Sequence, residues 1–168
     1  MRLSSLLSAI IFCACGAAAQ ARETVSWDGA LYPPGTIVIS QHKRELFLVV
    51  DPSTAIAYPV AVAKSGKEWL GAARVDGKYV EPAWSPPDSV RVDHPDIPAV
   101  IAGGAANNPM GARALTLDRD GIAIHGTSRS MRASIGHAAS YGCIRMLNED
   151  VIDLFARVRV GTPVVMTP

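Results

Sequence analysis

The main chemical signal in this chain is the heptapeptide Ser140-Tyr141-Gly142-Cys143-Ile144-Arg145-Met146. Gly142 allows a tight turn directly before Cys143, so the thiol can stand clear of the backbone. Arg145 follows two residues later, and residues i and i+2 of a strand share a face. A guanidinium in that position can bind a substrate carboxylate through paired hydrogen bonds, and its charge favours the thiolate. Cys143 is therefore a candidate nucleophile.

Residues 124–127, Ile-His-Gly-Thr, supply a candidate base. A thiol is a weak nucleophile until it loses its proton, and a neighbouring imidazole can accept that proton. His125 follows an apolar run and precedes Gly126, so it can face a cleft at the end of a strand. Backbone N–H groups around residues 141–143 can then stabilise an oxyanion, an effect worth about 3–4 kcal/mol in acyl-transfer sites. From spacing alone, a structural histidine and an inert buried thiol remain alternatives.

The beginning of the chain differs from the rest and predicts a secretory signal peptide over residues 1–21. Arg2 is the only charge before Arg22, and residues 6–15 form an apolar run. Small residues follow and end in Ala-x-Ala at Ala21, a pattern typical of a cleavage site. The apolar run is shorter than the roughly 20 residues of a membrane span. Cleavage is therefore favoured over an uncleaved anchor, and we expect an exported protein of the periplasm or cell envelope without stable membrane insertion.

The cysteine content and the net charge of the chain limit the functions that it can have. Cys13 and Cys15 would leave with the signal peptide, so Cys143 would stand alone in the mature chain. A lone cysteine in an exported protein is an inert thiol, an intermolecular disulfide partner or a nucleophile. The formal net charge of +1 gives no basic field for nucleic acid.

The pattern of apolar runs predicts a mainly β domain over residues 35–168, after a lead-in segment over residues 22–34. At 168 residues the chain is long enough for one domain. Strand-like runs separated by turn residues occur at 36–41, 45–50, 55–63, 114–117, 122–124 and 163–166. The first three resemble an antiparallel meander. Gly and Pro punctuate residues 64–113, where we expect short strands and long loops; Trp84 there could line a cleft or pack under a loop.

One helix is predicted late in the chain. Asn148 is a suitable N-cap, and two acidic residues follow it, where the helix dipole favours them. Apolar residues then recur at helical spacing up to Val158, and Gly161 ends the pattern. A β-rich chain with a single helix on its C-terminal side fits a β-sandwich-like fold or a partly closed barrel.

These motifs together resemble the L,D-transpeptidases of the YkuD type. Their signature is a His-Gly-Thr-like strand end followed, after a variable stretch, by Ser-His-Gly-Cys-Ile-Arg-Met. Further similarity lies in Asn-Pro-Met-Gly-Ala-Arg-Ala-Leu at 108–115, Ser-Ile-Gly at 134–136, Asn-Glu-Asp-Val at 148–151 and Val-Gly-Thr-Pro-Val at 160–164. The resemblance covers about residues 35–167.

The resemblance implies a β-sandwich-like catalytic domain that acts on peptidoglycan stem peptides without a metal or cofactor. Cys143 would attack the bond between the diamino acid and the terminal D-Ala of a tetrapeptide stem, with His125 as base. The resulting thioester would pass to an amine of a second stem, of an envelope lipoprotein or of a free D-amino acid; water instead would make the protein an L,D-carboxypeptidase. Oxyanion and substrate contacts would come from the remaining motif residues Gly126, Thr127, Ser140, Tyr141, Gly142 and Arg145.

Two positions depart from the family pattern. Tyr141 replaces the usual histidine directly before Gly-Cys, and Trp69 lies where many members show Thr-Pro-x-Gly. Because His125 still occupies the position of the base, we expect the thiol to remain activatable. His137, six residues before Cys143, falls in the variable stretch and is interpreted as a loop residue.

Other function classes fit less well. The sortases place the arginine far from the cysteine, and papain-like hydrolases place the cysteine before the histidine. A zinc peptidase needs His, Asp and Glu ligands around an open site. An inactive wall-binding module would not need both His125 and Cys143.

Overall fold

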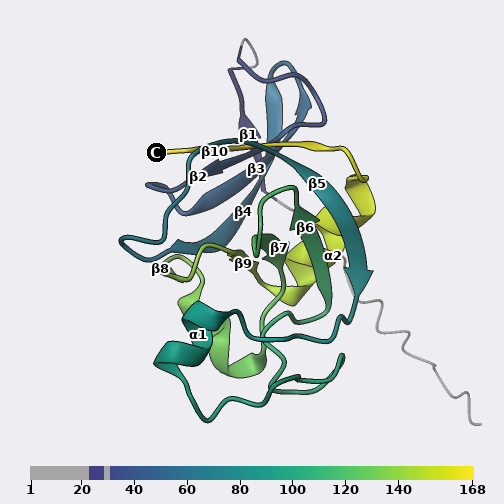
Figure 1. Ribbon diagram of the computed structural model, residues 1–168. Helices are drawn as coiled ribbons and strands as arrows, with labels where there is room; N and C mark the ends of the chain where they lie inside the picture. The colour runs from purple at the N-terminus through teal and green to yellow at the C-terminus, as the bar shows by residue number, and fades with distance from the viewer. Residues whose placement is uncertain (1–22, 29–30) are drawn as a thin grey trace, which may run out of the picture.

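The computed structural model describes residues 23–28 and 31–168, so the predicted signal peptide lies outside the described residues. Within that part of the chain, the strands form one ten-stranded sheet (Figure 1). They are β1 (Thr24–Ser26), β2 (Ile37–Ser40), β3 (Glu45–Asp51), β4 (Thr54–Ala63), β5 (Gly71–Val80), β6 (Arg113–Leu117), β7 (Ala123–His125), β8 (Ala138–Ser140), β9 (Ile144–Met146) and β10 (Pro163–Thr167). The mainly β prediction is confirmed.

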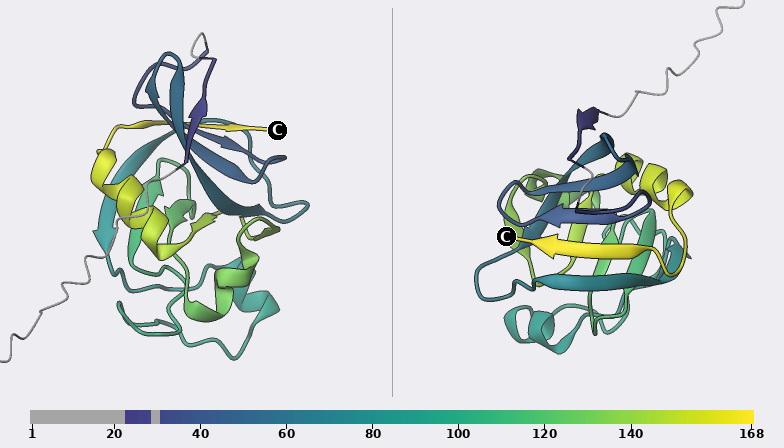
Figure 2. Two further views of the ribbon diagram at one scale, coloured as in Figure 1. Left: turned by 180° about the vertical axis from the view of Figure 1, so that it is seen from behind. Right: turned by 90° about the horizontal axis from the view of Figure 1, so that it is seen from above.

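The sheet closes on itself. The strands follow the order β1-β4-β3-β2-β10-β5-β6-β7-β9, and β9 pairs back onto β4, with Val60 opposite Met146. Strands β2, β3 and β4 form the predicted antiparallel meander. Strand β10 lies parallel to β2 and antiparallel to β5, as Figure 2 shows from above. The strong curvature and the β4–β9 pairing give a barrel-like form of the expected fold.

A continuous apolar core fills the closed sheet. Its largest fully buried side chains come from both halves of the chain, and include Ile37, Tyr58, Leu115, Ile144 and Leu154. A second, smaller cluster lies on the other face of the meander around Val38, Phe47, Val49 and Ala55, where Trp27 and Tyr32 pack against it. The predicted lead-in segment is thus part of the fold, because β1 pairs with β4 and these aromatic residues cover the outer face.

The late helix α2 (Asn148–Arg157) is present, but its start differs from the prediction. The N-cap position belongs to Leu147, and no side chain caps the helix there. Asn148 is not the cap because its side-chain amide bonds to backbone groups outside the helix. Val151 and Leu154 are buried, as the spacing predicted, and α2 packs on β6 and β7.

Three elements of the structure were not predicted. Strand β5 runs for ten residues where the sequence indicates only short strands; of its side chains only Ala73 and Val75 are buried, so it lacks an apolar run. Helix α1 (Asp88–Asp93) and the 3-10 helix η1 (Arg129–Ser134) bury no residue. Both helices lie toward the same end of the molecule in Figure 1. None of the helices in the described ranges is long and apolar enough to cross a membrane.

Candidate active site

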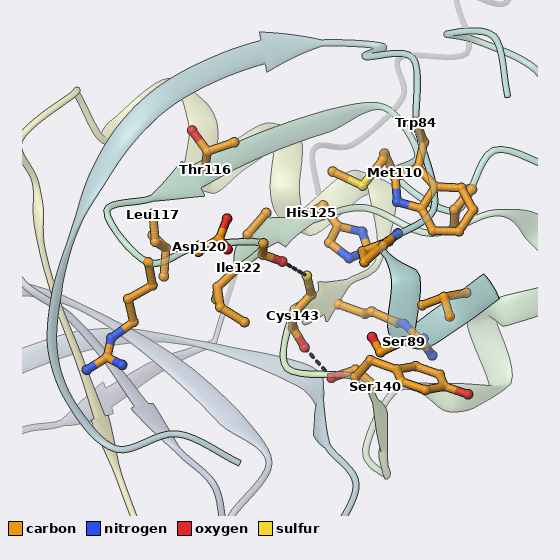
Figure 3. Close-up of a pocket in the computed structure, with 18 of the residues that line it drawn as sticks. Trp84, Ser89, Met110, Thr116, Leu117, Asp120, Ile122, His125, Ser140 and Cys143 are labelled. Atoms are coloured by element: carbon orange, nitrogen blue, oxygen red, sulfur yellow. Dashed lines mark hydrogen bonds between the residues drawn. The ribbon is translucent and has the colours of Figure 1, made fainter. Parts of the chain in front are cut away.

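Both sequence motifs open into one cleft of about 710 Å³ (Figure 3). Of the predicted site residues, His125, Ser140, Tyr141, Cys143 and Arg145 line it. The opposite wall comes from residues 84–90 and from Pro109 and Met110, and the turn between β6 and β7 completes the rim. Motifs that are separate in the sequence therefore form a single concave surface.

Parallel pairing of β7 and β9 brings the motifs together. Ile124 lies opposite Ile144, and His125 lies opposite Arg145. His125 is the last residue of β7, and Cys143 directly precedes β9. Residues paired across two strands point to the same face of the sheet, and so do residues i and i+2 of one strand. The side chains of His125, its partner Arg145 and Cys143 therefore reach the cleft from one face of these neighbouring strands.

The environment of His125 fixes its tautomer. The ring is buried, and Nδ1 donates a 2.7 Å hydrogen bond to the carbonyl oxygen of Gly126. A carbonyl can only accept, so Nδ1 carries the hydrogen and a neutral ring keeps Nε2 as an acceptor. Burial lowers the pKa of His125 to about 4; the carbonyls of Gly126 and Pro109 oppose this shift, and the charge of Arg145 adds to it. The imidazole is therefore neutral at pH 7 and can accept a proton.

The thiol of Cys143 is hydrogen-bonded to the turn between β6 and β7. Its Sγ donates to the carbonyl oxygen of Gly121 at 3.4 Å, rather than to His125. Burial raises the pKa of Cys143, whereas the backbone N–H of Ala123 and the charge of Arg145 lower it. The resting pair is accordingly a neutral thiol beside a neutral imidazole, and Figure 3 shows both groups facing the same cavity.

The turn before Cys143 is held by side chains on both sides. Gly142 has φ +130°, a conformation that favours glycine, and an added Cβ would lie 2.6 Å from Ile122 Cδ1. The Ser140 hydroxyl accepts from Gly142 N–H at 3.1 Å and donates to the Cys143 carbonyl at 2.5 Å. Trp69 Nε1 donates to the Gly142 carbonyl at 3.0 Å. The hydroxyl of Ser140 is thus engaged in shaping the turn.

Tyr141 connects the turn before Cys143 to the opposite wall of the cleft. Its hydroxyl donates a short hydrogen bond to the carboxylate of Asp93, at the end of α1. Lys64 Nζ lies 3.7 Å above the Tyr141 ring and 3.5 Å from Asp93 Oδ2. The hydrogen bond from Tyr141 lowers the pKa of Asp93. The tyrosine that replaces the family's histidine therefore takes part in a contact across the cleft.

Gly126 and Thr127 lie behind the cleft and not on its surface. Thr127 lines a separate cavity of about 190 Å³ together with Asn148. Asn148 Oδ1 accepts from the backbone N–H groups of Ala112 and Thr127, and its Nδ2 donates to the Thr127 carbonyl. A Cβ on Gly126 would lie 2.2 Å from Asn148 Oδ1. Both residues were predicted to contact substrate, and that role stays a prediction; in this structure their backbone supports the strand end at His125.

Several residues of the cleft carried no sequence signal. Trp84 was noted as a possible cleft residue and does line it, and Met110 belongs to the family-like stretch at 108–115. Ser89, Arg119 and Asp120 were missed. They come from loops whose spacing has no period, so only the closed fold brings them together. His137 is not among the lining residues. Within the described ranges, no group of three or more His, Cys, Asp or Glu side chains could hold a metal ion.

Comparison with known proteins matches the chain to one family. The model of the YkuD L,D-transpeptidase catalytic domain matches residues 34–166. A probable L,D-transpeptidase, YbiS of Escherichia coli (strain K12), is 33% identical over 138 residues, which are 77% of this chain and 43% of that protein. A putative L,D-transpeptidase, YqjB of Bacillus subtilis (strain 168), is 32% identical over 137 residues, 78% of this chain and 70% of that protein.

Solved structures show the same fold. L,D-transpeptidase 3 from Mycobacterium tuberculosis superposes with a TM-score of 0.64 at 17% identity, covering 79% of this chain and 60% of that chain. The present chain spans less than half the length of its E. coli relative. With the family model covering most of the chain, and with His125, Cys143 and Arg145 of the two motifs lining one cleft, this protein belongs to the YkuD family of L,D-transpeptidase catalytic domains.

Proposed function

We propose that this protein is a cysteine-dependent L,D-transpeptidase that acts on peptidoglycan stem peptides. The observation that carries the proposal is the tautomer of His125. With Nδ1 bonded to the Gly126 carbonyl, the neutral ring presents Nε2 as an acceptor in the cleft that holds Cys143. A neutral, oriented imidazole beside a thiol is the arrangement that nucleophilic acyl transfer needs.

In the proposed reaction, His125 takes the thiol proton as Cys143 Sγ attacks the carbonyl of the bond between the diamino acid and the terminal D-Ala. The tetrahedral intermediate collapses, the C–N bond breaks and the imidazolium returns its proton to the leaving amine. A thioester remains on Cys143. An acceptor amine then attacks the thioester carbonyl and loses its proton to His125. The new amide leaves, and the proton returns to the thiolate.

The geometry of Cys143 requires one movement before attack. Its Sγ must leave the Gly121 carbonyl and turn toward the imidazole and the substrate. Catalytic hydrogen bonds are often long or absent until substrate binds, so the resting geometry is compatible with this role. We propose that proton transfer and attack occur in one step, because burial disfavours both the charged thiolate and the charged imidazolium before substrate binds.

Arg145 is the proposed recognition element for the donor. Its partly buried guanidinium lines the cleft on the same strand edge as Cys143, and a tetrapeptide stem ends in a free carboxylate. A guanidinium binds a carboxylate with paired, charge-assisted hydrogen bonds. Bound this way, the D-Ala carboxylate would lie one residue from the scissile carbonyl.

We further propose that the chain is exported by the signal peptide at residues 1–21 and acts in the periplasm or cell envelope.

Mass spectrometry of the intact protein tests the proposal. Incubation with a tetrapeptide stem should add the mass of the stem less D-Ala, as a thioester. Cys143→Ala should abolish the adduct, and His125→Ala should slow its formation by about 10²-fold or more. His137→Ala is the matched control and should react like the unaltered protein. An adduct that persists in Cys143→Ala would reject the nucleophile assignment.

The acceptor is tested separately. Incubation with purified sacculi followed by mass spectrometry of the released muropeptides distinguishes 3→3 cross-links from trimmed tripeptides. A lysine-containing lipoprotein tail or a D-amino acid, added as a competing amine, would give its own adduct. Tripeptides alone would identify the protein as an L,D-carboxypeptidase, and no turnover with an intact acyl-enzyme would point to a missing acceptor.

A further inference from the structure

The loop between β4 and β5 contacts the turn that precedes Cys143. Trp69, in this loop, packs its ring against the main core and directs Nε1 to the carbonyl oxygen of Gly142 at 3.0 Å. Arg119 holds the loop from the other side: its guanidinium carbon lies 4.7 Å from the Trp69 ring centre, and Nη2 donates to the carbonyls of Leu70 and Ala72. The indole is thus fixed in place before any substrate arrives.

A hydrogen bond to the Gly142 carbonyl also sets the direction of the next N–H. The peptide bonds of the described chain are all trans, and in a trans peptide the C=O and N–H groups point in opposite directions. The carbonyl of the Gly142–Cys143 peptide points to Trp69, which does not line the cleft. The Cys143 N–H of the same peptide therefore points away from Trp69. Cys143 itself lines the cleft on that side.

The remaining hydrogen bonds of the turn leave this N–H available. Gly142 N–H is used, because it donates to the Ser140 hydroxyl. The hydrogen bonds among the described residues include none donated by the Cys143 N–H. A group that stabilises an oxyanion must be held in place and must have no other hydrogen-bond acceptor. The backbone N–H of Cys143 meets the second condition, and it belongs to the residue whose thiol would attack.

We propose that Trp69 is a positioning residue of the acyl-transfer reaction: its indole N–H orients the Gly142–Cys143 peptide so that the Cys143 N–H binds the developing oxyanion. The inference rests on the proposed function of Cys143. Gly142, at φ +130° and without a side chain, has more rotational freedom than other residues. The following peptide bond therefore needs a hydrogen bond from another segment to hold its orientation. Trp69 touches neither substrate nor thiol and acts through the backbone.

Substitution of Trp69 by phenylalanine tests the role, since phenylalanine keeps an aromatic ring under Arg119 but loses the N–H. Two reactions of Cys143 are compared in the full chain. Acylation by a tetrapeptide stem passes through an oxyanion, whereas alkylation by iodoacetamide does not. We expect W69F to lower the acylation rate by about tenfold, less than the loss of a whole donor, which costs about 10²–10³. The alkylation rate and its pH profile should stay within about twofold.

Trp27→Phe is the matched control, because its buried indole N–H has no hydrogen-bond partner among the described residues. It should change neither rate. An unchanged acylation rate in W69F would overturn the inference, and so would an equal fall in both rates, which would indicate a disturbed thiol. Should W69F fail to fold, 3-benzothienylalanine at position 69 removes the N–H and keeps the shape. Absence of acylation in the unaltered protein would instead count against the proposed function.

Discussion

Replacing Asn148 with alanine should destabilise the fold through contacts remote from the cleft surface. The side-chain amide makes three hydrogen bonds to backbone groups: it accepts from Ala112 N–H at 3.0 Å and Thr127 N–H at 3.1 Å, and it donates to the Thr127 carbonyl at 3.0 Å. A Cβ on Gly111 or Gly126 would lie only 2.2 Å from Oδ1. The amide therefore fills a space that both glycines keep open.

The size of the effect follows from these bonds. Each hydrogen bond of this kind contributes about 1 kcal/mol net, and an orphaned buried partner costs more. The cavity of about 190 Å³ beside Asn148 is roomy enough for water to reach the orphaned groups, which reduces the loss. We expect Asn148→Ala to lower the free energy of unfolding by about 2–3 kcal/mol. For a domain of this size, that corresponds to a fall in Tm of roughly 5–10 °C.

Urea and thermal unfolding followed by circular dichroism measure this change. Ile152→Ala on the exposed side of the same helix is the control, and should alter the free energy of unfolding by no more than about 0.5 kcal/mol. Asn148→Asp keeps both acceptor contacts and adds a favourable charge at the helix start, but it places a carboxylate oxygen against the Thr127 carbonyl. We therefore expect a loss of stability that is smaller than that of Asn148→Ala but not zero. A loss below about 0.5 kcal/mol in Asn148→Ala would refute the reasoning.

Two further predictions concern titration and the contact across the cleft. Burial holds the pKa of His125 at about 4, below the unfolded value of about 6.5, so the unfolded chain binds more protons between these pH values and stability falls as the pH drops. At pH 4.5 the loss relative to pH 7 should be about 2–3 kcal/mol in urea unfolding, and His125→Gln should lack this component; equal pH slopes would contradict a buried neutral imidazole. Tyr141→Phe and Asp93→Ala remove the same hydrogen bond, so each should raise KM for a tetrapeptide donor by a similar factor with little change in kcat, and the double variant should be no worse. Multiplied effects in the double variant would show that the two residues act independently.

The sequence predicts the elements in which apolar residues recur with a clear period. The meander of β2–β4 and the buried face of α2 are examples, because each buries one face and exposes the other. The candidate pair of His125 and Cys143 could also be named, since both stand beside glycines at strand ends. Their meeting in one cleft depends on the parallel β7–β9 pairing, which no local pattern encodes.

Features that depend on side chain to backbone contacts between distant segments could not be predicted. Asparagine is a favoured N-cap residue, but the Asn148 amide forms hydrogen bonds with the backbone of two other segments. The helix therefore starts without a side-chain cap. Trp69 looks like a departure from a loop motif, and only the closed fold shows its N–H on the Gly142 carbonyl. Strand β5 escaped prediction because it buries few side chains and is held mainly by backbone pairing to β6 and β10.

Burial of the proposed base also bears on the step that breaks the amide. A depressed pKa makes the neutral His125 a weaker base but makes its protonated form a stronger acid. Expulsion of an amine from a tetrahedral intermediate needs such an acid, because an amine without the added proton is a poor leaving group. The first proton transfer, from Cys143 to His125, is correspondingly harder. The charge of Arg145 has two opposing effects on this transfer, because it lowers the pKa of both groups. A lower pKa of His125 favours departure of the amine, so we expect Arg145 to assist mainly this second step. Its replacement by methionine should therefore slow acylation by an amide more than acylation by a thioester of the same stem, and equal slowing would restrict Arg145 to substrate binding.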